Sequence, residues 1–81
     1  MMKMSWKVMP VVDWSSYAKG VLRAEMMRKG ISYADLVGAL EDAGVKESEA
    51  NLRNKVSRGS FTAAFLFQCL SVMGVKTLHL D

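Results

Sequence analysis

The sequence predicts a mainly α fold: a compact four-helix domain with an extended N-terminal arm and a short C-terminal strand. Apolar residues recur at helical spacing in successive segments, and a capping residue precedes each segment. Glycine follows each one, as it does at helix C-termini. The 81 residues are 51% hydrophobic and 23% charged, which is typical of a single globular domain. The glycines that follow the four segments are Gly30, Gly44, Gly59 and Gly74.

The first two helices are expected between residues 15 and 44. Ser15 or Ser16 is the expected N-cap of the first, which runs to Lys29. Ser32 is the expected cap of the second, with Asp35 in the carboxylate position of a capping box. The side chains expected to face inward are Ala18, Val21, Leu22, Met26, Leu36, Ala39, Leu40 and Ala43.

Two further helices are expected over residues 49–58 and 63–73, capped by Ser48 and Thr62. Leu52 and Val56 mark the inward side of the third helix. The fourth is the most apolar, but a membrane span needs about 20 apolar residues, so we expect a buried helix. Its inward candidates, with the residue just before it, are Phe61, Phe65, Leu66, Cys69, Leu70 and Met73.

The ends of the chain differ from its centre. Residues 1–14 combine Trp6, Trp14, Pro10 and several valines, which favours an extended arm. Residues 15–75 form the helical domain, and the tail, 76–81, continues an alternation from Val75 that favours a short strand. Two exposed tryptophans are unfavourable in water, so we expect the arm to pack on the helical body or a second subunit. The arm and the tail therefore predict a homodimer.

Composition excludes several classes of function. The chain has one cysteine and one histidine, which argues against a disulfide framework, a metal site and any cofactor. No base–nucleophile pair or phosphate loop is visible, so we expect no catalytic residues and no enzyme. The sequence shows no signal peptide or membrane segment, which favours a cytoplasmic protein with no membrane contact. A net charge of +3 permits an anionic partner.

Several stretches resemble lambda-repressor-like helix-turn-helix domains over about residues 18–75. Residues 30–37 resemble the start of their second helix, Arg58-Gly59 the end of their recognition helix, and residues 70–75 their last helix. The chain is more closely similar to a small bacterial family of unknown function. That resemblance rests on Trp14, on residues 17–19, 49–51, 53–55 and 57–59, and on residues 65–70. The chain departs from the repressor pattern by about one added helical turn before Gly44.

The resemblance implies DNA binding, and the third helix has suitable side chains for it. Asparagine can pair with adenine and arginine with guanine in the major groove. The resemblance places base contacts at Asn51, Asn54 and Lys55, and we add Arg53 beside them. It implies phosphate contacts from the start of the second helix and the end of the third. These phosphate candidates are Ser32, Tyr33, Arg58, the amide of Gly59, and Ser60. The expected partner is double-stranded DNA, and the expected role is regulation of transcription.

An acidic segment leaves a second interpretation open. Between residues 41 and 49 the chain carries four carboxylates against one lysine, at the start of the supposed recognition helix. Carboxylates there would repel phosphate unless they point away from it. The alternative is a protein-interaction module, of antitoxin or adaptor type, that uses this acidic turn.

Overall fold

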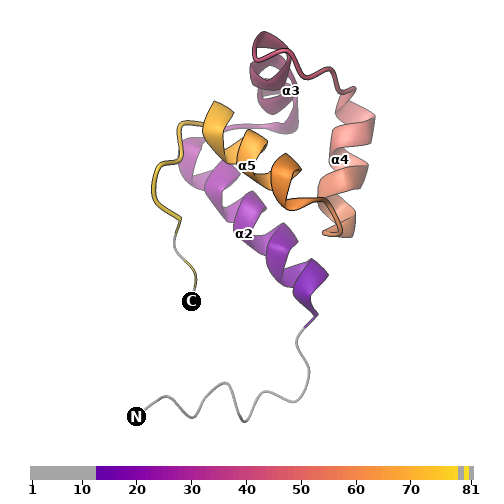
Figure 1. The fold of residues 1–81 in the computed structure, drawn as a ribbon, viewed down its shortest axis with the longest axis vertical. Helices are drawn as coiled ribbons and strands as arrows, with labels where there is room; N and C mark the ends of the chain where they lie inside the picture. Colours follow the sequence, from indigo (N-terminus) through magenta and orange to yellow (C-terminus); the bar gives the residue numbers. More distant parts are fainter. Residues whose placement is uncertain (1–12, 79, 81) are drawn as a thin grey trace.

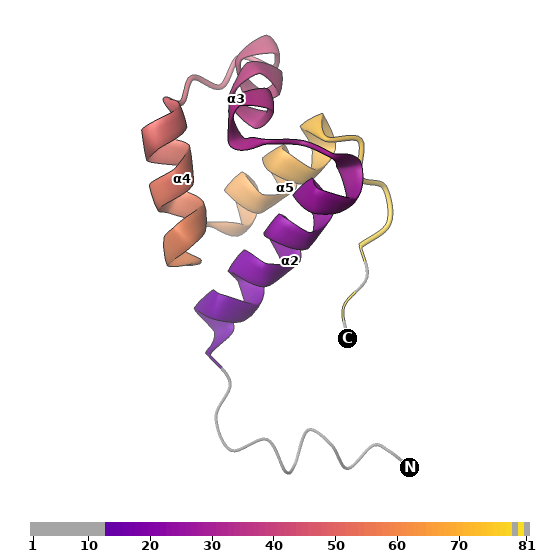
Figure 2. The same cartoon turned by 180° about the vertical axis from the view of Figure 1, so that it is seen from behind.

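The computed structural model describes residues 13–78 and 80, and these form four successive helices (Figure 1). The helices are α2 (Trp14–Lys29), α3 (Tyr33–Asp42), α4 (Glu49–Arg58) and α5 (Ala63–Val72). α2 packs against α4 and α5, and α3 packs against the same two helices. Figures 1 and 2 show α5 stacked across α2, with α4 on one side of this pair and the tail on the other. The prediction of a mainly helical, four-helix domain is confirmed.

One apolar core holds the helices together. Each helix contributes at least two buried side chains to it, as the helical spacing predicts. Ala18, Val21, Ala39, Phe61 and Leu66 are only partly buried, and the prediction that Ala43 faces inward is wrong because it is exposed. The buried set is Leu22, Met26, Leu36, Leu40, Leu52, Val56, Phe65, Cys69, Leu70 and Met73.

The first helix begins earlier than predicted, and its cap is Asp13. The Asp13 carboxylate accepts hydrogen bonds from the amides of Ser15 and Ser16, at 3.1 and 3.3 Å. It also accepts the Ser16 hydroxyl at 3.0 Å, so this serine binds the cap instead of acting as one. Trp14 is therefore the first residue of α2, whereas the sequence places it in the arm. The rest of the predicted arm lies outside the described residues.

The remaining helix starts are confirmed. Ser32 accepts the amide of Asp35 at 3.1 Å, and the Asp35 carboxylate accepts the amide of Ser32 at 3.0 Å. Ser48 and Thr62 each accept an amide three residues on, at 3.1 and 3.0 Å. These bonds satisfy amides that have no partner within a helix.

The predicted C-terminal strand is wrong within residues 75–78, which contain no strand. The amide of Val75 donates to the carbonyl of Leu70 at 2.9 Å, so it completes the end of α5. Val75 and Leu78 then pack against the core. The alternation over residues 75–80 therefore does not produce a strand in this segment, and Val75 and Leu78 instead cover the helices. No helix formed by the described residues combines the length and apolar character needed to cross a bilayer.

Two large apolar side chains of α2 lie on the surface, and one of them, Trp14, was expected to be covered. Trp14 is 68% exposed and meets Tyr17 edge-on, with ring centroids 5.7 Å apart. Met27 is 82% exposed, although its neighbour Met26 is in the core. Glu25, in contrast, is buried and ion-paired with Arg28. The sequence shows Arg28 three residues after Glu25, but it gives no sign that the carboxylate is buried.

Candidate nucleic-acid interface

α4 contacts the rest of the molecule through one narrow side. Leu52 and Val56 are fully buried, and the other eight residues of this ten-residue helix are exposed. Because successive helical residues turn by about 100°, five of the exposed residues point away from this buried pair. They define the α4 face: Ala50, Asn51, Asn54, Ser57 and Arg58.

The polar groups of the α4 face are not engaged within residues 13–78. There, neither a hydrogen bond nor an ion pair holds the side chain of Asn51, Asn54 or Arg58. Asn51 takes part only through its main-chain amide, which donates to the hydroxyl of Ser48. Amide and guanidinium groups in this state can bind base edges without first breaking a contact inside the protein.

Arg53 lies at the edge of the α4 face, between two partners. Its Nη2 is 2.6 Å from Oε2 of Glu49, and its guanidinium carbon is 4.8 Å from the centre of the Tyr33 ring. The first contact joins neighbouring turns of α4, and the second ties α4 to the start of α3. Both contacts orient Arg53 toward the first turn of α3.

Lys55, one of the predicted base contacts, projects from the side of α4 opposite Arg53, toward α5. Its ammonium lies 4.8 Å from the centre of the Phe65 ring and pairs with Glu47. Cys69 is buried beyond it, and this burial raises the pKa of the thiol to about 11. Lys55 is therefore a link between α4 and α5, and the Cys69 thiol is protonated at neutral pH.

A hollow of about 380 Å³ joins three helices beside Arg53. Of the predicted site residues, it brings together Ser32, Tyr33 and Arg53. Arg23 of α2 lines the same hollow, and the sequence analysis did not select it. On the sequence, Arg23 is one of several cations outside the apolar stripe of the first helix. Only the packing of α2 against α4 places it near the start of α3.

Gly59 and Ser60 follow α4, and the structure gives them different surroundings. Gly59 is buried with a φ of +69°, and its amide donates to the carbonyl of Val56 at 3.1 Å. A Cβ at this position would lie 1.9 Å from the carbonyl oxygen of Ser15. The amide that the resemblance assigned to a phosphate is thus used inside the protein, and the glycine permits close packing on α2. Ser60 is exposed.

The connection between α3 and α4 carries the acidic residues. It runs from residue 43 to residue 48, longer than the three or four residues usual in a helix-turn-helix. α3 continues through Gly38 to Asp42, as the added turn in the sequence predicts. A hollow of about 230 Å³ lies against this connection and brings Asn51 next to Glu41 and Glu47. Asn51 is therefore the residue of the α4 face that adjoins the acidic turn.

The comparisons with known proteins identify the family. A family described as a domain of unknown function (DUF6471) matches residues 14–78. The chain belongs to this family. The DUF6471 match begins at the first residue of α2 and ends at Leu78, which packs against the core, so it includes all four helices. No curated protein and no solved structure gave a significant match.

Proposed function

We propose that this DUF6471 protein binds double-stranded DNA, with α4 in the major groove, and regulates transcription. The observation that carries the proposal is the α4 face, where the amides of Asn51 and Asn54 and the guanidinium of Arg58 have no side-chain partner in the described structure. The resemblance to lambda-repressor-like domains supports the same surface. A single α-helix fits the major groove, and these groups match adenine and guanine edges.

The proposed phosphate contacts come from the hollow between α2, α3 and α4. Arg23 and Arg53 from two helices line it, together with the first residues of α3. The start of a helix carries partial positive charge, and one arginine can donate hydrogen bonds to two oxygens of the same phosphate. Phosphate bound here would fix the orientation of α4 in the groove.

The carboxylates near the start of α4 are partly neutralised. Glu49 pairs with Arg53 and Glu47 with Lys55, so two of the four acidic residues have a cation of α4 beside them. Exposed ion pairs of this kind contribute at most about 1 kcal/mol. Arg53 can therefore exchange Glu49 for phosphate at little cost.

The proposal is tested by fluorescence anisotropy of labelled random-sequence duplex DNA. We expect micromolar binding that weakens steeply between about 50 and 200 mM salt, because phosphate contacts release counterions. Arg58→Ala should weaken binding by about 1–3 kcal/mol if the guanidinium reads a base. Lys76→Ala is the matched control: it also removes one positive charge, but in the tail, on the opposite side of the molecule from α4 (Figures 1 and 2). Equal effects of the two variants, or no binding at either salt concentration, would refute the proposal.

A second candidate function rests on the acidic turn. Glu41 and Asp42 at the end of α3 are exposed, and Glu41 lines the hollow next to Asn51. This surface suits a basic segment of a protein partner. Charge reversal with Glu41→Lys and Asp42→Lys should then abolish capture of that partner and leave the DNA affinity no weaker. Capture that survives both substitutions would contradict the role of the acidic turn in binding that partner.

A further inference from the structure

We infer that the outward side of α5 is the interface of a two-fold homodimer. Its central feature is Phe67, whose side chain is 62% exposed although it is a large aromatic group. Phe67 and Ser71, one helical turn apart, both line two hollows in the surface. The ridge that they form separates a hollow of about 410 Å³ next to the tail from one of about 340 Å³ next to α3.

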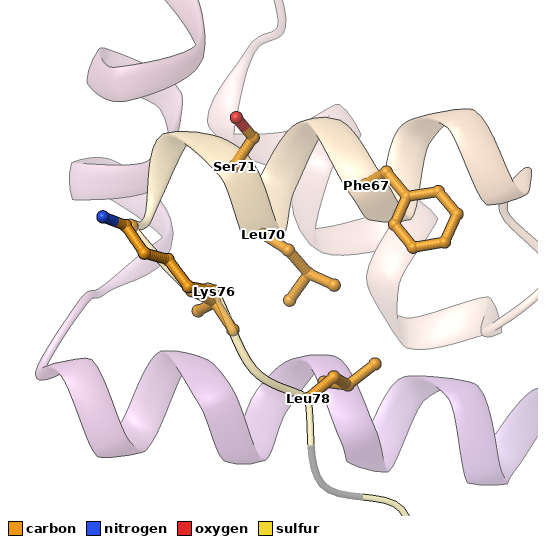
Figure 3. A pocket seen from close by; sticks show the side chains of 7 residues that line it. Phe67, Leu70, Ser71, Lys76 and Leu78 are labelled. Carbon is orange, nitrogen blue, oxygen red and sulfur yellow. The ribbon is translucent and has the colours of Figure 1, made fainter.

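The hollow next to the tail has a mainly apolar lining. Figure 3 shows Phe67 and Leu70 projecting from α5 and Leu78 from the tail that runs beside it. Lys76 is the one charged residue among those that line either hollow in the described part of the chain. A nucleic acid needs several cations, and a charged peptide needs opposite charges, so this surface favours neither. This lining favours an occupant that is apolar and uncharged.

A second copy of the chain meets this requirement by its shape as well as its chemistry. In a two-fold contact, both copies use the same surface. The ridge of each copy can therefore face a hollow of the other. Each Phe67 ring would then enter a hollow of its partner. A benzene-sized ring fits a cavity of about 150 Å³, so either hollow is large enough. Aromatic groups buried at the centre of an interface commonly contribute most of its binding energy.

The area that a stable dimer buries indicates how much of the protein surface the contact must cover. A standard interface buries about 800 Å² on each partner. The protein exposes 5669 Å², so such an interface would cover roughly a seventh of it. The hollows extend from the end of α3, across α5, to the tail, and both must contribute to reach this area. This assigns the dimer contact to α5 and residues 75–78, whereas the sequence analysis assigned it to the two ends of the chain.

The inference is tested by the mass of the full chain in solution, measured by sedimentation equilibrium at increasing protein concentration without DNA. We expect the wild type to approach twice its 9.0 kDa mass. Phe67→Lys and Ser71→Arg should both remain at 9.0 kDa, because each places a charge on the ridge. Both side chains are exposed, so the helical content measured by circular dichroism should stay unchanged.

Met27→Lys is the matched control for Phe67→Lys. It replaces another exposed apolar side chain by lysine, on α2 and outside both hollows, and it should remain dimeric. A monomeric wild type would overturn the inference, and so would a dimer that survives both ridge variants. Because no DNA is present, the result is independent of the proposed DNA binding.

Discussion

Among the six glycines, Gly59 is the one whose replacement the structure tolerates least. A side chain there meets the backbone of Ser15, which cannot move aside as a flexible side chain could, and φ is +69°. We expect Gly59→Ala to lower the free energy of unfolding by about 2–5 kcal/mol, from the overlap and the left-handed backbone together. Gly44→Ala is the control, since its φ is +88° but no atom lies within 4 Å of an added Cβ. It should lose only about 1–2 kcal/mol. Chemical denaturation gives both values, and equal losses would contradict the packing role of Gly59.

The carboxylates of the two capping residues Asp13 and Asp35 should make the free energy of unfolding fall at acid pH. Hydrogen bonds from the amides of Ser16 and Ser32 lower the pKa values of Asp13 and Asp35 below the usual 3.8. A carboxyl with a lowered folded-state pKa stabilises the fold above its unfolded pKa, and this contribution is lost as the pH falls through the folded value. Wild type should therefore lose more stability between about pH 4 and pH 2 than the Asp13→Asn/Asp35→Asn variant. Thermal melts across this range test the expectation, and parallel curves would contradict it.

At the scale of the helices, local signals in the sequence were enough to place the elements. Three of the four caps, and the αL glycines after α2 and α4, follow from contacts within a few residues. Asp13 was missed because two serines beside it are also good caps, and only the geometry distinguishes them. The strand predicted for the tail rests on the alternation of residues 75–80, whereas the positions of Val75 and Leu78 are set by long-range packing on the core. Alternation alone cannot distinguish the two cases.

The candidate site was predictable along α4 but not across helices. The spacing of Leu52 and Val56 is enough to orient Asn54 and Arg58 outward. The contact of Arg53 with Tyr33, and the place of Arg23 near both, depend on how α2 and α3 pack against α4. The ion pair of Lys55 with Glu47 joins α4 to the α3–α4 connection, so no helical periodicity in the sequence predicts it.

Arg53 could act by binding phosphate or by neutralising Glu49, and the ion pair between the two residues allows these roles to be distinguished. Arg53→Ala alone should weaken DNA binding in either case, because it removes a cation and leaves Glu49 without a partner. If Arg53 binds phosphate, the Glu49→Ala/Arg53→Ala variant should stay weaker than wild type, with a salt slope smaller by about 1. If the arginine only neutralises Glu49, the double variant should recover the wild-type affinity. Anisotropy titrations of wild type and the three variants, including Glu49→Ala, distinguish the two outcomes.

At the scale of the whole molecule, the proposed DNA surface and the proposed dimer surface are on different helices. α4 lies at one side of the molecule, while α5, the helix that carries Phe67 and Ser71, crosses α2 (Figure 1). A dimer formed through α5 therefore leaves both α4 helices exposed. Two linked copies bind neighbouring half-sites on DNA more tightly than one, because the second contact becomes intramolecular.

Because the two surfaces are separate, one substitution on the ridge should affect DNA affinity in two opposite ways. Phe67→Lys adds a positive charge, which by itself strengthens attraction to DNA, but it should also break the dimer. We expect the loss of the second α4 to dominate and weaken binding by at least tenfold, equivalent to about 1.4 kcal/mol. Met27→Lys also adds one positive charge and leaves the ridge intact, but Met27 lines the hollow that holds Arg23 and Arg53, so this variant should bind DNA more tightly than wild type. Anisotropy of the three proteins on the same duplex gives the comparison. If Phe67→Lys binds as tightly as wild type, DNA binding does not depend on the α5 surface, even if that surface forms a dimer in solution.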